Sequence, residues 1–258
     1  MKTALESSPR PGWLRPEWPA PVGSALESTV TELQRVLGSR CLSVILYGGL
    51  AKGEFVLERS DVNLMVVVDQ VTLELLDQVA PLLQRSTDSV RLSVLLLSED
   101  DLRRSTDVFP IKFLDIQRYH QVLAGRDVVA GLTIARHHLR LRCEQELKNL
   151  LLRLRQFYLE RSRRPEMLET TLTRAVSSLL INLGVLAELK TGVLSPTKLV
   201  ALENAGKLGL QTEPVRQVLA LKRGELKPEA AGLKELYASF MFTVEKAARM
   251  ADELEEGS

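Results

Sequence analysis

The sequence predicts an α/β domain, a mixed sheet with flanking helices, followed by an all-α helical bundle domain. Two observations carry this prediction. Residues 42–68 contain two apolar, strand-like runs on either side of a diglycine turn, and from residue 128 onward the apolar side chains recur every three or four positions, which is the helical period. With 258 residues, 45% hydrophobic and 26% charged, the chain has the length and composition for one large globular domain or two modest ones.

The chain divides into three predicted segments. Residues 1–22 contain five prolines and both tryptophans, so they cannot be helical throughout. We expect either an arm whose tryptophans pack onto the body, or an arm that binds a partner or a second copy, because exposed tryptophan is costly. Residues 23–126 are predicted to form the α/β domain and residues 127–258 the helical bundle domain.

The α/β domain is expected to begin with a helix over 24–38 that ends at Gly38, followed by one strand before and one strand after the diglycine turn. A helix over 71–86 and a strand over 90–97 should come next. We then expect a helix over 98–106 with Ser98 as its N-cap, an extended segment or short strand over 109–116, and a turn over 122–127 that marks the domain boundary.

The second domain is predicted to be an antiparallel bundle of four or five helices. A long helix over 132–161 has leucines on one stripe, and a second helix starts at Pro165, a first-turn position. Prolines also precede the remaining helices, at Pro196, Pro214 and Pro228.

The most informative stretch is LSVILYGGLAKGEFVLERSDVNLMVVV, residues 42–68. Glycines before a short helix let backbone N–H groups approach a phosphate, whose charge the helix N-terminus favours. Lys52 adds a point charge to this turn. Asp61 and Asn63 are two apart on a strand, so they share a face, and paired oxygen ligands suit Mg²⁺. A phosphate turn opposite a metal-binding strand end is what nucleotidyl transfer requires.

The same stretch resembles the nucleotidyltransferase superfamily, the polymerase-beta-like fold, whose signature is a strand, Gly-Ser, a short helix with Ala-Arg-Gly-Glu, and Ser-Asp-hydrophobic-Asp. The chain matches at Gly48, at Ala51-Lys52-Gly53-Glu54 and at Ser60-Asp61; it departs at Gly49, which replaces Ser, and at Asn63, which replaces Asp. Helical bundles follow this fold in antibiotic-modifying and toxin–antitoxin relatives. The resemblance implies Mg²⁺ as cofactor, metal binding and catalysis at Asp61 and Asn63, and phosphate binding at Gly48, Gly49, Lys52 and Ser60.

Active members of the superfamily usually have a third carboxylate on a neighbouring strand. The strand over 90–97 has no acid, and its polar residues are Arg91 and Ser93. Asp115 is the remaining candidate for a third catalytic carboxylate. With Asp61 as the one charged metal ligand, we expect a nucleotide- or phosphate-binding protein with a degenerate site and weak or no transfer activity. The alternatives are an active Mg²⁺-dependent enzyme that moves AMP or another NMP to a hydroxyl or protein side chain, and a non-catalytic interaction scaffold.

Charge and cysteine content limit the partners. The net charge of +1 gives no global attraction to nucleic acid or membrane, so the expected partners are a nucleoside triphosphate and a second copy or another protein. The arginine-rich stretch from Arg136 to Arg164 is interpreted as a solvated helix face, with a phosphate- or RNA-facing stripe as the alternative. Cys41 and Cys143 are expected to be reduced thiols in a cytoplasmic protein. Neither a signal peptide nor a membrane-spanning apolar run is expected.

Overall fold

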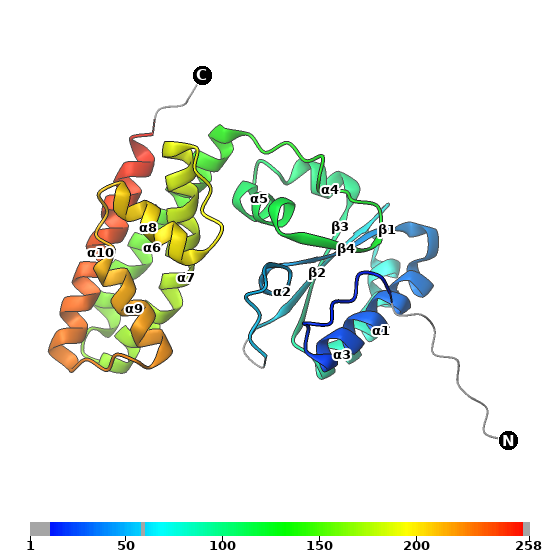
Figure 1. Ribbon diagram of the computed structural model, residues 1–258, viewed down its shortest axis with the longest axis horizontal. Coiled ribbons are helices and arrows are strands. Elements are labelled where there is room, and N and C mark those ends of the chain that lie inside the picture. The colour runs from blue at the N-terminus through cyan, green and yellow to red at the C-terminus, as the bar shows by residue number, and fades with distance from the viewer. Residues whose placement is uncertain (1–10, 58–59, 255–258) are drawn as a thin grey trace. The chain divides into compact units, whose positions relative to one another are not determined.

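A computed structural model of the protein describes residues 11–57 and 60–254, apart from the side chains of residues 86–89. The chain divides into two compact units between Thr133 and Ile134. The first unit is a sheet with flanking helices and the second is entirely helical in its described part (Figure 1). The predicted fold class is therefore confirmed.

The described part of the first domain contains a four-stranded sheet in the order β3-β2-β1-β4. The strands are β1 (Cys41–Tyr47), β2 (Val62–Val68), β3 (Leu92–Ser98) and β4 (His120–Gly125). β1 is antiparallel to both β2 and β4, whereas β2 and β3 are parallel. The end of β1 therefore lies beside the starts of the other three strands. This edge of the sheet holds the diglycine turn.

Helices cover both faces of the sheet (Figure 1). On one face, α1 (Ala20–Leu37) and α3 (Leu73–Ser89) pack against the even-numbered side chains of β1 and β2, from Val44 to Val68. The other face carries the odd-numbered side chains Ile45, Met65 and Val67, all fully buried. On its side lie α4 (Glu99–Arg104) and α5 (Pro110–Arg118), whereas the short helix α2 (Gly49–Lys52) at the edge of the sheet buries Leu50 in the same core as α1 and α3. Asp61 and Asn63 are odd-numbered, so the candidate site belongs to this second face.

Two predicted elements of this domain are wrong. The segment over 109–116 is not extended: α5 starts with Pro110 in its first turn and buries Phe113 and Ile116, which are one helical turn apart. The turn over 122–127 is instead mostly strand β4, which pairs with β1 and ends at Gly125. The helix over 98–106 is confirmed as α4, whose Ser98 forms a capping box with Asp101.

The described part of the N-terminal arm packs onto its own domain. Trp18 is buried, and Trp13 and Leu14 pack against the same apolar core as α1. The Gln121 side chain of β4 donates to the backbone carbonyl of Trp13 at 2.6 Å and accepts from Arg15 at 2.9 Å. These contacts agree with a packed arm. The first ten residues of the arm lie outside the described residues.

The described part of the second domain comprises helices α6 (Arg136–Arg161), α7 (Pro165–Thr191), α8 (Lys198–Lys207), α9 (Glu213–Arg223) and α10 (Ala230–Asp252). α7 packs against the other four helices, and the Tyr237 hydroxyl of α10 donates to the Leu154 carbonyl of α6 at 2.8 Å. By length and composition α7 could cross a membrane, contrary to the expectation that no apolar run is long enough to do so. However, 56% of its apolar window is buried within the protein, as in the core helix of a bundle.

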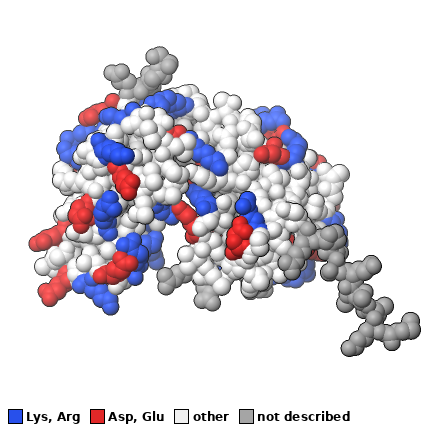
Figure 2. All heavy atoms as spheres, viewed as in Figure 1, with Lys and Arg blue, Asp and Glu red and all other residues white. Residues whose placement is uncertain are grey.

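The arginine-rich helix α6 is largely neutralised by neighbouring acids. Arg140 and Lys148 pair with Glu144, Arg142 pairs with Glu146, and Arg155 contacts Glu245 of α10. On the face shown in Figure 2, basic and acidic side chains alternate over the described part of the helical domain. This distribution favours the solvated helix face over a phosphate-binding stripe.

Candidate functional site

A row of polar side chains crosses the sheet at the edge where β1 ends. Tyr47 is in register with Asn63 of β2 and with His120 of β4, and Asn63 is in register with Ser93 of β3. Residues directly opposite one another on neighbouring strands share a face. Tyr47, Asn63 and Ser93 therefore lie side by side on the face that carries α4 and α5.

The diglycine turn lies against this row. Gly48 has φ +75° and ψ −150°, and a Cβ atom there would lie 2.7 Å from Asn63 Nδ2. This backbone conformation is essentially restricted to glycine, so Gly48 allows both the turn and its approach to Asn63. Gly49 begins α2, whose first N–H groups have no partner inside the helix. Because α2 has four residues, its dipole contributes little, and anion binding would depend on side-chain cations.

Lys52, at the end of α2, contributes one such cation. Its Nζ lies 2.6 Å from Asp115 Oδ1 on α5 and 5.0 Å from the centre of the Tyr119 ring. The Lys52 side chain is 21% exposed and that of Asp115 is 39% exposed. The structure thus brings together two predicted site residues that are 63 positions apart in the sequence. The Asp115 carboxylate is engaged with a cation in this arrangement.

Lys112 is a second cation on α5. Its Nζ lies 6.0 Å from the centre of the Tyr47 ring. Burial raises the pKa of the Tyr47 hydroxyl above its ordinary value of 10.0, so the tyrosine is neutral at physiological pH. Lys112 and Lys52 therefore place two positive charges beside the diglycine turn and the polar row.

Asp61 lies just before β2 and forms an ion pair with Arg91, which lies just before the neighbouring strand β3. Its Oδ1 accepts from Arg91 Nε at 2.8 Å, with the Arg91 side chain 60% exposed and that of Asp61 50% exposed. The Asn63 amide Nδ2 donates to the Asp61 backbone carbonyl at 3.4 Å. Asp61 and Asn63 thus lie close together as expected, but the Asp61 carboxylate is bonded to a guanidinium.

Ser60 closes the loop that leads into β2. Its hydroxyl accepts from the Val56 N–H at 3.0 Å, and its own N–H donates to the Val56 carbonyl at 2.8 Å. These bonds give Ser60 a role in the loop structure. Its predicted contact with a phosphate stays a prediction.

The donor set at the site fits a protein-held Mg²⁺ poorly. The described residues contain no group of three His, Cys, Asp or Glu side chains placed to bind a metal ion. Asp61 and Asp115 are each bonded to a cation, and Asn63 and Ser93 add no charge. Mg²⁺ prefers one or two carboxylates with room for waters and substrate phosphates. The residues that would hold it, Asp61 and Asn63, supply one carboxylate, already paired.

Three residues of the site were not assigned a role from the sequence. Arg91 was noted only as a polar strand residue, although a parallel register of β2 and β3 would have placed it opposite Asp61. Lys112 was missed because the segment over 109–116 was predicted to be extended and its helical spacing was not recognised. Tyr119 lies outside that segment, directly after α5, and was given no role.

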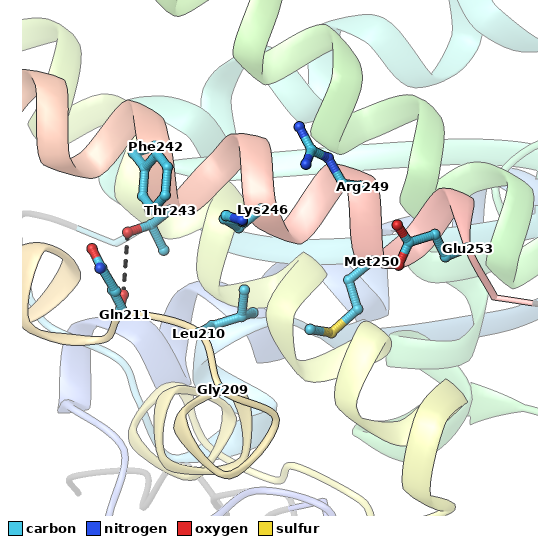
Figure 3. A pocket seen from close by; sticks show the side chains of 9 residues that line it. All are labelled: Gly209, Leu210, Gln211, Phe242, Thr243, Lys246, Arg249, Met250 and Glu253. Atoms are coloured by element: carbon cyan, nitrogen blue, oxygen red, sulfur yellow. Dashed lines mark hydrogen bonds between the residues drawn. The ribbon is translucent and has the colours of Figure 1, made fainter.

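A separate cavity of about 500 Å³ lies within the helical domain. It is formed by α10 and the connection between α8 and α9 (Figure 3). Leu210 and Met250 point toward one another, and the Thr243 hydroxyl donates to the Gln211 carbonyl at 3.2 Å. Lys246 and Arg249 of α10 also line it. None of the predicted site residues lines this cavity, so we place the candidate site at the edge of the sheet.

Comparison with known proteins supports the fold assignment. No protein-family model matches the chain, and no curated protein matches it by sequence. The chain is similar in structure to a spectinomycin adenyltransferase from Enterococcus faecialis, whose crystal structure contains ATP and spectinomycin. The TM-score is 0.57 at 12% sequence identity, and the match covers 89% of this chain and 99% of that one. A likeness at this identity establishes the architecture, and the chain therefore has the nucleotidyltransferase fold.

Proposed function

We propose that the first domain binds the phosphates of a nucleoside triphosphate and has weak or no nucleotidyl-transfer activity. The observation that most supports this proposal is that two ion pairs occupy the site, Lys52 with Asp115 and Arg91 with Asp61. The superfamily uses carboxylates at such a site to hold metal ions. Here each carboxylate is neutralised, while the glycine turn and the cations are retained.

The structural neighbour contains ATP, which supports a nucleotide as the ligand. Phosphate recognition would use Lys52 and Lys112 as point charges, together with the backbone N–H groups of Gly48 and Gly49. A nucleotide can bring its own Mg²⁺, so binding would be at most partly metal-dependent. Such a ligand agrees with the expected cytoplasmic location, where nucleoside triphosphates are available.

The second candidate function is an active nucleotidyltransferase that moves AMP or another NMP to a hydroxyl or protein side chain. The observation that favours it is that the crystal structure of the similar spectinomycin adenyltransferase contains both ATP and spectinomycin. For Asp115 to act as the base, its carboxylate would have to leave Lys52 and reach the acceptor. A base must be within hydrogen-bond reach of the proton that it removes.

Calorimetric titration of the full-length protein with ATP, GTP, CTP and UTP tests the proposal, in EDTA and in excess Mg²⁺. We expect weak binding that survives EDTA, and no transfer of label from α-labelled ATP to protein or hydroxyl acceptors. Lys52→Gln should weaken binding, whereas Arg104→Gln, which removes an exposed ion pair with Asp100, should not. Sub-micromolar, strictly metal-dependent binding would favour the enzyme. Absence of binding by every nucleotide would favour the scaffold.

A further inference from the structure

Arg91 directly precedes β3, the strand on which the resemblance to active nucleotidyltransferases implies a further carboxylate. β2 and β3 are parallel, and Val62 is in register with Leu92 and Asn63 with Ser93. One residue earlier, Asp61 faces Arg91 in the same register, and the 2.8 Å bond between them shows the two side chains on one face. The neighbours of the Asp61–Asn63 pair on β3 are therefore a guanidinium and a hydroxyl.

We propose that Arg91 acts in place of a metal ion, so that the ligand is a metal-free nucleoside triphosphate and Mg²⁺ weakens its binding. This inference rests on the proposed function of the same site. It adds that the nucleotide binds without a metal ion and that Mg²⁺ lowers the affinity.

The charge of the site supports this role. Among the side chains described above, Arg91, Lys52 and Lys112 are cations, and Asp61 and Asp115 are carboxylates. These five side chains carry three positive and two negative charges, an excess of positive charge that favours a polyphosphate over a free divalent cation. Mg²⁺ neutralises part of the charge of a triphosphate. The metal complex should therefore be attracted less strongly than the free nucleotide.

The geometry of the guanidinium supports the same role. Among the described residues, Arg91 bonds through Nε alone, to Asp61 Oδ1. A guanidinium has five N–H donors in a planar fork that matches phosphate oxygens. The terminal amino groups of Arg91 are therefore available to a phosphate while Asp61 holds Nε and orients the fork. Asp61 would act as a positioning residue for Arg91.

The opposing interpretation is that the Asp61–Arg91 pair is a surface ion pair without a ligand. Exposed pairs of this kind contribute little to stability, and both side chains are half-exposed or more. Under that interpretation, removing Arg91 should leave nucleotide affinity unchanged in any buffer.

The test is calorimetric titration of ATP into five full-length proteins, the parent, Arg91→Gln, Arg91→Lys, Arg91→Asp and Arg104→Gln, each in EDTA and in excess Mg²⁺. Arg104 is the matched control because it lies in the same domain and forms an exposed pair with Asp100 at 2.9 Å. Arg91→Lys, which keeps the charge without the fork, should lie between the parent and Arg91→Gln. Tryptophan fluorescence of each protein verifies that the first domain remains folded.

We expect the parent to bind ATP more tightly in EDTA than in Mg²⁺. Arg91→Gln should lose about tenfold in affinity in EDTA, the effect of one charge-assisted bond, and Arg104→Gln should match the parent. Arg91→Asp should lose binding in EDTA and regain part of it with Mg²⁺. An Arg91→Gln affinity in EDTA equal to the parent's, or a parent affinity in EDTA that Mg²⁺ leaves unchanged or raises, would overturn this inference alone. Binding by the parent only when Mg²⁺ is present would contradict both this inference and the metal-independent binding expected from the proposed function. Absence of ATP binding in both buffers would overturn the proposed function and this inference with it.

Discussion

Gly48→Ala is the substitution whose cost follows most directly from the structure. The φ of +75° and ψ of −150° at Gly48 lie in a region open essentially to glycine, and forcing another residue there costs about 1–3 kcal/mol. The new Cβ would also lie 2.7 Å from Asn63 Nδ2, closer than van der Waals contact. We therefore expect a loss of about 3 kcal/mol in the free energy of unfolding of the first domain.

Two further variants separate these two causes. Gly53→Ala has a similar φ of +74° but open space around its Cβ, so it should cost about 1 kcal/mol. In an Asn63→Ala background the contact with Nδ2 is absent, and Gly48→Ala should cost less than in the parent.

The assay is urea unfolding followed by tryptophan fluorescence. The chain has two tryptophans, Trp13 and Trp18, and both pack in the first domain, so the signal reports on that domain. The midpoint should fall while the slope of unfolding free energy against urea stays constant. A Gly48→Ala loss no larger than that of Gly53→Ala would refute the described turn and its approach to Asn63.

Three further predictions concern charge. Asp115→Asn releases Lys52 from its partner, so the ATP affinity measured by calorimetry should rise. A lower affinity would instead indicate that Asp115 orients the lysine. The double variant Asn63→Asp, Arg91→Asp rebuilds a carboxylate cluster, so added Mn²⁺ should raise the melting temperature of its first domain. The rise should be smaller for Asn63→Asp alone. If Mn²⁺ does not raise the melting temperature of the double variant, these positions do not form a metal-site remnant. Burial, with Glu144 and Glu146 nearby, raises the pKa of Cys143 to about 12, and burial raises that of Tyr237 to about 12. The folded state therefore holds both protons more tightly than the unfolded chain. The stability of the helical domain, measured by unfolding followed with circular dichroism, should fall from pH 9 toward pH 12. Constant stability over this range would contradict the burial of these groups.

The sequence was sufficient to predict the elements with regular local patterns. The strand alternation around the diglycine turn, the Ser98 cap of α4 and the prolines before the bundle helices each depend on nearby residues. The segment Phe109–Phe113 was predicted incorrectly because apolar residues at 109, 111 and 113 alternate as in a strand. Its helical face, Phe113 and Ile116, becomes evident only when Pro110 is recognised as a first-turn residue. β4 was missed because it is six residues long and fully buries only Leu123.

The sequence was sufficient to predict most residues of the candidate site, but not the ion pairs that they form. Glycine conformation and the spacing of Asp61 and Asn63 are local properties that can be inferred from the chain. The ion pairs join residues 63 and 30 positions apart, and they depend on the packing of α5 and on the register of β3 against β2. These long-range contacts change the charge of the site and hence its proposed chemistry.

The measurement that tests the central claim most directly is NMR of full-length protein labelled with ¹⁵N at its 15 glycines, titrated with ATP in EDTA. We predict that the amide resonances of Gly48 and Gly49 shift progressively and reach saturation without metal. The same resonances should shift less at equal ATP when Mg²⁺ is present. Gly48 and Gly49 resonances that stay in place at high ATP, or that move only after Mg²⁺ is added, would contradict a cation-lined, metal-independent nucleotide site.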